Sequence, residues 1–234
     1  MSVTHDTFRQ NIDRLKTDLA EQGLRVQSLI ETAFEAVFAR DPAGGPRVAA
    51  MDESIDRADV EIEKSAVRLL TAATAQSAGL GPEQLRLVLT IVKINNELER
   101  IADAGVGIAE AIPGNAAATI PVPETFRVLA NSVIGILRDA NTSFDKANPA
   151  LARVVLLSED AVGAFKQALI RETQAQLARG QISADLAFAR LEIATFCQVM
   201  ADHCTNIAEQ VIYVASGSIV RHMKGQWEEL PPPA

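Results

Sequence analysis

The sequence contains few cysteines and no long apolar run. Two cysteines in 234 residues exclude a scaffold held together by disulfides. The longest apolar stretches, at 87–92 and 154–157, are far shorter than the roughly 18 residues that a membrane span needs. The first ten residues include no apolar core typical of a secretion signal. We therefore expect a soluble, intracellular protein with no direct membrane insertion.

Positive charge and aromatic residues are also scarce. The 30 Asp and Glu residues outnumber the 22 Lys and Arg residues, which leaves a formal net charge of −8. This balance argues against a nucleic-acid-binding protein and against adsorption to an anionic membrane, since both need a clustered basic surface. Hydrophobic residues make up 48% of the chain but aromatic ones 4%, so a full core is possible and helix is favoured over sheet.

Apolar residues recur at steps of three and four, which predicts six helices. Proline and glycine interrupt this pattern at 41–46, 79–82 and 113–123. The expected helices cover residues 4–40, 48–75, 82–112, 124–147, 149–179 and 182–217. Gly23 lies between two apolar sets of the first helix, where it is expected to kink the helix or shift its apolar stripe.

The helical pattern occurs twice along the chain. The stretch 102–110 returns at 201–209 with Ala, Asp, Ile, Ala and Glu in the same places, and Asp-Pro-Ala at 41–43 returns as Asn-Pro-Ala at 148–150. Helices of one unit cannot bury their apolar stripes alone, so the sequence predicts an all-α fold of two tandem three-helix bundles. We assign residues 1–112 to the first bundle, 113–123 to a linker, 124–218 to the second bundle and 219–234 to a C-terminal tail with a frayed end.

Two carboxylate pairs mark the first bundle. Asp52 and Asp56 are four residues apart on one predicted helix, and Glu99 and Asp103 are four apart on the next. Residues at this spacing share a helix face, so each pair presents its oxygens together. Such oxygens bind hard cations such as Mg, Mn, Ca or Fe. A continuous acidic stripe along 52–63 is also typical of a solvated helix face, and the sequence leaves both interpretations open.

The second bundle retains this pattern in part. Glu159 occupies the place of Asp52, and Asp202 that of Asp103. Gly163 and Gln198 replace the other two carboxylates, so any second metal site is expected to bind more weakly.

Other residues that bear chemistry have no patterned partners. We expect His203 to cap a helix or lie at the surface rather than bind metal, and Cys197 and Cys204 to be small core residues. Gly105 and Gly107 are expected to permit close helix packing. The sequence has no Ser-His-Asp arrangement, Walker A loop or dinucleotide fingerprint. We therefore assign no catalytic residue and expect a protein that is not an enzyme.

The sequence resembles the PhoU family of phosphate-transport accessory and signalling regulators. The resemblance covers nearly the whole chain, and three stretches carry it most clearly: 51–56, 98–103 and 202–213. The first is similar to the family's D-x-x-I-D pattern, and the other two are similar to its E-R-I-G-D and D-H-A-T-N-I-A-E patterns. At 81–86 the sequence departs from the family's P-x-A-x-D-L-R run and keeps the final Leu-Arg.

The resemblance implies a non-catalytic adaptor between a phosphate ABC transporter, through its ATPase subunit, and a membrane sensor histidine kinase. Such an adaptor represses the phosphate-starvation response and limits phosphate uptake, from a cytoplasmic position at the inner membrane held through protein partners. It also implies that the carboxylates bind a divalent or trivalent metal ion: Fe, Mn, Mg or Zn. The implied ligands are Asp52, Asp56, Glu99, Asp103, Glu159 and Asp202.

Alternative functions follow from the same residues. The paired carboxylates alone suit a metal-binding helical protein, although the Glu-x-x-His ligands of a di-metal oxidase are missing. A divergent family member could also serve a different phosphate carrier. Because bundles with extra apolar helix faces commonly pair, we expect a homodimer.

Overall fold

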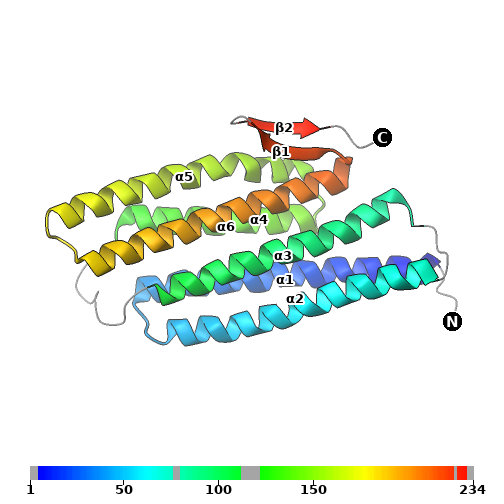
Figure 1. Ribbon diagram of the computed structural model, residues 1–234, viewed down its shortest axis with the longest axis horizontal. Helices are drawn as coiled ribbons and strands as arrows, with labels where there is room; N and C mark the ends of the chain where they lie inside the picture. Colours follow the sequence, from blue (N-terminus) through cyan, green and yellow to red (C-terminus); the bar gives the residue numbers. More distant parts are fainter. Residues whose placement is uncertain (1–4, 76–79, 112–121, 224–225, 231–234) are drawn as a thin grey trace.

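A computed structural model describes residues 5–75, 80–111, 122–223 and 226–230, with only the backbone at 5–7 and beyond 221. These residues form two three-helix bundles followed by a β-hairpin (Figure 1). The helices are α1 (His5–Ala39), α2 (Gly44–Ala75), α3 (Pro82–Glu110), α4 (Glu124–Asp145), α5 (Pro149–Ala178) and α6 (Ala184–Ser216). The predicted all-α class and the duplicated bundle are therefore confirmed.

Short-range signals fix the helix ends of the second bundle. The Asn148 side chain accepts hydrogen bonds from the backbone N–H groups of Ala150 and Leu151, both at 3.1 Å, and Pro149 follows in the first turn of α5. The Ser183 hydroxyl accepts from the Leu186 N–H at 3.2 Å at the start of α6. Gly217, at φ 75°, ends α6 in the left-handed conformation.

The predicted start of the second helix, at residue 48, is four residues too late. α2 already begins at Gly44, although Pro46 follows. A proline in the first turn costs no hydrogen bond, because the first N–H groups of a helix have no partner within it. The preceding Asp41 side chain accepts from the Ala43 N–H at 2.9 Å and helps to turn the chain. The proline-glycine signal is therefore genuine, but it marks a shorter break.

The backbone also repeats itself at the equivalent turns of the two bundles. Arg40 and Ala147 both adopt positive φ angles, 55° and 46°, directly before the Asp-Pro and Asn-Pro pairs. Non-glycine residues rarely adopt this conformation. Its recurrence at matching positions supports the internal repeat that the sequence suggested.

The two bundles contact each other through α3 against α6 and through α1 against α4. Gly23 lies in the second contact, and α1 continues through it. A Cβ at Gly23 would lie 2.7 Å from Asn141 Oδ1, and the Asn141 amide donates a hydrogen bond of 2.9 Å to the Gly23 carbonyl. Gly23 therefore permits a close approach between bundles, a role that the sequence did not indicate.

Close packing also explains the glycines and cysteines near the bundle contact. A Cβ at Gly105 would lie 2.4 Å from Leu29 Cδ2, and one at Gly107 would lie 2.3 Å from the Phe196 ring. Both cysteines are free and fully buried. Burial raises the pKa of Cys197 to about 12, so its thiol stays protonated at neutral pH. The packing roles predicted for the four residues are confirmed.

The expected C-terminal tail contains an antiparallel hairpin that the sequence analysis did not foresee. β1 (Ile219–Met223) pairs with β2 (Gln226–Leu230), with Ile219 opposite Leu230. Arg221 of β1 pairs with the carboxylate of Glu209 on α6, which holds the first strand against the helix. The predicted linker at 113–123 lies outside the described residues except for its last two positions.

Candidate functional site

A hydrogen bond between α2 and α3 sets the level at which their carboxylates meet. The Asn95 amide on α3 donates to Asp59 Oδ1 at 2.6 Å and to the Asp59 carbonyl at 3.0 Å. The two helices run in opposite directions (Figure 1), so positions before Asp59 on α2 lie beside positions after Asn95 on α3. The carboxylate pair on α2 therefore lies at the level of the pair on α3.

Electrostatic repulsion links the four predicted carboxylates of the first bundle. Burial, followed by repulsion from Asp56 and Asp103, raises the pKa of Asp52 to about 6. Burial and the nearby Asp103, Asp59 and Asp56 raise the pKa of Glu99, while the adjacent Arg100 partly opposes the rise. Repulsion across the two helices identifies a shared acidic surface. We call these five carboxylates the acidic cluster: Asp52, Asp56, Asp59, Glu99 and Asp103.

The chemistry of the acidic cluster suits a hard cation. Its donors are carboxylate oxygens. Burial and repulsion raise the pKa of Asp52, and a bound cation would relieve the repulsion. Asn95 Oδ1 lies beside the cluster, buried and without a hydrogen-bond donor. Among the described residues, however, no three His, Cys, Asp or Glu side chains converge closely enough to hold a metal ion. Cation binding therefore requires the acidic side chains to change rotamer.

The raised pKa of Asp52 predicts that Asp52→Asn stabilises the protein at neutral pH when no metal is added. A carboxyl with a higher pKa in the folded state opposes folding when ionised. We expect a gain of a few tenths of a kcal/mol at pH 7, since solvent screens this half-exposed group. The gain should shrink below about pH 6 and vanish near the unfolded value of about 3.9.

Urea unfolding across this pH range measures the effect. Glu53→Gln is the matched control, since Glu53 lies on the same helix, exposed, with Arg57 at 3.8 Å. A loss of stability in Asp52→Asn at pH 7 would contradict the inferred cost of burying this carboxylate beside Asp56 and Asp103.

The corresponding surface of the second bundle is less acidic. The Gln198 amide donates to Asp202 Oδ1 at 2.8 Å and so occupies one of its oxygens. A Cβ at Gly163 would lie 3.8 Å from Gln198 Oε1, which places these two departures from the motif opposite each other. Glu159 lies half-buried on α5. Two retained carboxylates thus share this surface with an amide and a glycine.

A polar cluster at the contact between α3 and α6 was missed by the sequence analysis. His203 Nδ1 lies 2.6 Å from Glu97 Oε2, and the Asn206 amide donates to the same oxygen at 3.0 Å. The side chains of Glu97 and His203 are 22% and 23% exposed. His203 therefore links the two bundles, and its predicted role as a cap or surface residue is wrong.

The two repeats place different side chains at matching positions of this contact, and only one of them places a carboxylate there. A shift of 99 residues relates the two copies of the motif, so Glu97 corresponds to Phe196 and Asn206 to Gly107. Glu97 bonds Asn206 across the contact, and Phe196 packs on Gly107 in the matching position. One half of the contact is polar and the other apolar, and comparison of the two repeats was the signal that could have revealed it.

Glu97→Gln is expected to reduce the stability of the contact and its dependence on pH. Burial alone would raise the pKa of Glu97, but the hydrogen bonds from His203 and Asn206 and the charges of His203 and Arg100 lower it overall. A carboxyl with a lowered pKa stabilises the folded state above its unfolded value, about 4.3, and loses this effect as the pH falls further. We expect Glu97→Gln to cost about 1–3 kcal/mol at pH 7.

Urea unfolding between neutral and acid pH tests this prediction. The loss of stability in acid should be shallower for Glu97→Gln than for the unmodified protein. Glu110→Gln, an exposed change on the same helix, should alter neither quantity. Equal acid sensitivity of Glu97→Gln and the unmodified protein would contradict the assigned role.

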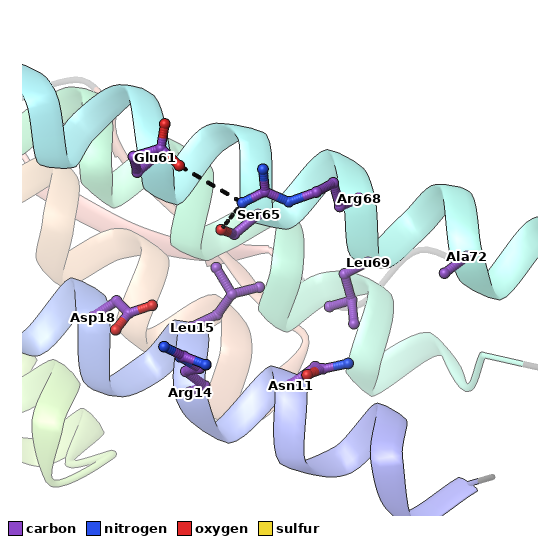
Figure 2. Close-up of a pocket in the computed structure, with 9 residues that line it drawn as sticks. All are labelled: Asn11, Arg14, Leu15, Asp18, Glu61, Ser65, Arg68, Leu69 and Ala72. Atoms are coloured by element: carbon purple, nitrogen blue, oxygen red, sulfur yellow. Dashed lines mark hydrogen bonds and ion pairs between the residues drawn. The ribbon is translucent and has the colours of Figure 1, made fainter. Parts of the chain in front are cut away.

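A groove of about 560 Å³ lies on the other side of α2, against α1 (Figure 2). Leu15 and Leu69 line it, and Arg14 and Asp18 border it with opposite charges. Arg68 donates to the Ser65 hydroxyl at 2.8 Å at its edge. The groove includes none of the predicted metal ligands, so the acidic cluster remains the candidate site. In the described ranges, no helix is both long and apolar enough to cross a membrane.

The comparisons with known proteins agree with the architecture. The chain is 26% identical to the phosphate-specific transport system accessory protein PhoU homolog 1 of Thermotoga maritima, across 92% of this chain and 91% of that protein. It is 22% identical to the PhoU protein of Escherichia coli K12, across 93% and 89%. The crystal structure of PhoU from Streptococcus pneumoniae matches with a TM-score of 0.82 and 21% identity, across 92% and 99%.

The family comparison covers both bundles. The PhoU-domain model matches residues 19–112 and 126–211, one match for each repeat. These two stretches make up most of the sequence, and the chain belongs to the PhoU family.

Proposed function

We propose that this protein is a non-catalytic regulator of phosphate homeostasis. The observation that carries the proposal is the PhoU domain in each bundle, together with relatives named as phosphate-specific transport system accessory proteins that align over nearly their whole length. The protein acts as an adaptor between the ATPase subunit of a phosphate ABC transporter and a membrane sensor histidine kinase. In phosphate-replete cells it represses the phosphate-starvation response and limits uptake. It does so from the cytoplasmic side of the inner membrane, where its protein partners hold it.

Metal binding is the second part of the proposal. Asp52, Asp56, Glu99 and Asp103 hold a divalent or trivalent ion such as Fe, Mn, Mg or Zn, and the ion neutralises the repulsion within the acidic cluster. Glu159 and Asp202 form a weaker site in the second bundle, because an amide already occupies one Asp202 oxygen. What supports this assignment is the donor chemistry and the shared level of the pairs on α2 and α3.

We also propose that the protein forms a homodimer. Apolar side chains remain exposed on the helices of both bundles, among them Val154 and Leu157 on α5. Light scattering of the purified protein should give about twice the chain mass of 25.1 kDa. A mass equal to one chain at micromolar concentration would contradict this part.

The experiment that tests the regulatory role is a phosphate-starvation reporter in phosphate-replete cells that lack the gene. We expect high output without the gene and low output once the intact gene is restored. A gene that carries Gly135→Ala is the control for expression of a substituted protein. A Cβ at Gly135 would meet open space, so this variant should repress as the intact protein does. Unchanged output on deletion would overturn the role, and would favour an accessory of another phosphate carrier or a protein whose function is metal binding alone.

A further inference from the structure

The outer surface along α2 and α3 exposes large apolar side chains next to the acidic cluster. Val60 and Val67 on α2 are 45% and 57% exposed, and Leu85 and Leu89 on α3 are 40% and 55% exposed. Seven residues separate the two valines and four separate the two leucines, so each pair lies on one side of its helix. We call this set the apolar patch.

The antiparallel packing of α2 and α3 places the apolar patch and the acidic cluster at opposite ends of one surface. The bond between Asn95 and Asp59 marks the middle. Towards the C-terminal end of α2, Val67 lies about 12 Å beyond Asp59, and Leu89 and Leu85 lie about 9 and 15 Å back along α3 from Asn95. Towards the other end lie the paired carboxylates. One end of the surface is acidic. The other exposes Val67, Leu85 and Leu89, with the exposed Glu63 between Val60 and Val67. The surface extends about 27 Å from residue 85 to residue 103 of α3.

The charges decide which occupant suits this surface. An anionic membrane is repelled by the carboxylates, although the apolar patch alone would suit it. A second copy of the same surface would bring carboxylates against carboxylates or against valine and leucine, and neither arrangement neutralises them. A segment that carries Lys or Arg next to apolar residues complements both the acidic cluster and the apolar patch. Arg100 lies at the edge, its Nε 3.4 Å from Glu99, and shows that a guanidinium can approach this cluster.

We propose that this surface of α2 and α3, when the acidic cluster holds no metal ion, binds an amphipathic helix of a partner protein, with Lys or Arg side chains on the acidic cluster and apolar side chains on the apolar patch. A helix of about 20 residues spans the surface. Its cationic end speeds encounter with the cluster, and its apolar face supplies the buried contact. The inference rests on the proposed adaptor role and defines the chemistry of one partner contact.

Fluorescence anisotropy of the metal-free protein with designed peptides tests the proposal. The probe is a labelled helical peptide of about 20 residues with Lys and Arg in its first turns and Leu along one face of the rest. Its twin carries Glu in place of each basic residue. We expect the basic peptide to bind at least about tenfold more tightly than the acidic twin, and its affinity to fall as ionic strength rises. Equal binding of the two peptides, or binding of neither, would overturn the proposal.

Variants of the protein locate the contact. Val67→Ser with Leu89→Ser should weaken binding of the basic peptide about tenfold. Asp56→Lys with Asp103→Lys should remove most of the preference for the basic peptide, because three carboxylates then face two lysines. Leu177→Ser with Phe188→Ser is the matched control, since these exposed apolar residues lie on α5 and α6. An equal loss in the control, or a dimer that the Val67 and Leu89 changes separate, would contradict the assignment.

The cellular reporter separates this inference from the proposed function. Deletion of the gene could raise reporter output while the Val67→Ser, Leu89→Ser protein still represses fully. In that case the proposed helix contact is wrong and the regulatory role stands. If deletion changes nothing, the regulatory role fails, and the peptide measurements alone decide whether the surface binds a cationic helix.

Discussion

Leu29→Ala and Gly105→Ala are each expected to destabilise the first bundle, but the double variant should cost less than the sum of the two. Leu29 is fully buried, so its truncation leaves a cavity and costs about 2–5 kcal/mol. A Cβ at Gly105 would lie 2.4 Å from Leu29 Cδ2 and 2.5 Å from Ile30 Cδ1, which forces a shift that costs about 1–3 kcal/mol. In the double variant the new methyl group occupies part of the space that leucine leaves.

Urea unfolding of the four proteins measures this coupling, which we expect to reach about 1 kcal/mol. The clash with Ile30 remains in the double variant, so the compensation is partial. Gly135→Ala is the control for the helical preference of alanine, because a Cβ there meets open space and should stabilise α4 by about 0.5–1 kcal/mol. Additive costs at Leu29 and Gly105 would show that the two residues do not share one contact.

Much of the fold could be predicted because its signals are local. The period of apolar residues locates six helices, and the Asn-Pro and Ser signals before α5 and α6 locate their starts. The β-hairpin differs, because strands this short acquire their pairing from each other and from the Arg221–Glu209 contact. No repeating pattern within 219–230 indicates that pairing.

The candidate site could be predicted within a helix but not between helices. Spacing places Asp52 beside Asp56 and Glu99 beside Asp103, whereas the level at which the pairs meet depends on the bond between Asn95 and Asp59. Glu97 shows the limit more clearly, since its partner His203 lies 106 residues away in the sequence. The role of a residue at a contact between repeats depends on the residue opposite, which local spacing cannot supply.

The two repeats have kept one fold while their surfaces diverged. Gly105 and Gly107 preserve close packing in the first repeat, where the motif of the second has Cys204 and Asn206. At the positions that match Glu99 and Asp103 of the acidic cluster, the second bundle has Gln198 and Asp202, which are joined by a hydrogen bond. Cation affinity is therefore expected to reside mainly in the first bundle, although both bundles match the same family domain.

Asp52→Asn combined with Glu99→Gln is expected to remove most of the bound metal. The double change removes two of the four proposed ligands and two of the charges whose repulsion a cation relieves. Elemental analysis of protein loaded with Mn or Fe and then desalted should show near-background metal for this variant. Glu159→Gln with Asp202→Asn, the matched change in the second bundle, should retain most of the metal.

A gain of binding in the second bundle provides the reciprocal test. Gly163→Asp with Gln198→Glu restores the missing carboxylates, and a Cβ at Gly163 would lie at an ordinary van der Waals distance, 3.8 Å, from Gln198 Oε1. The change also frees Asp202 from the amide that now occupies one of its oxygens. We expect metal content to rise above that of the unmodified protein, because carboxylate number governs affinity for hard cations. Metal-free protein from a metal-replete preparation, or unchanged content in both sets of variants, would show that the acidic cluster is a solvated helix face.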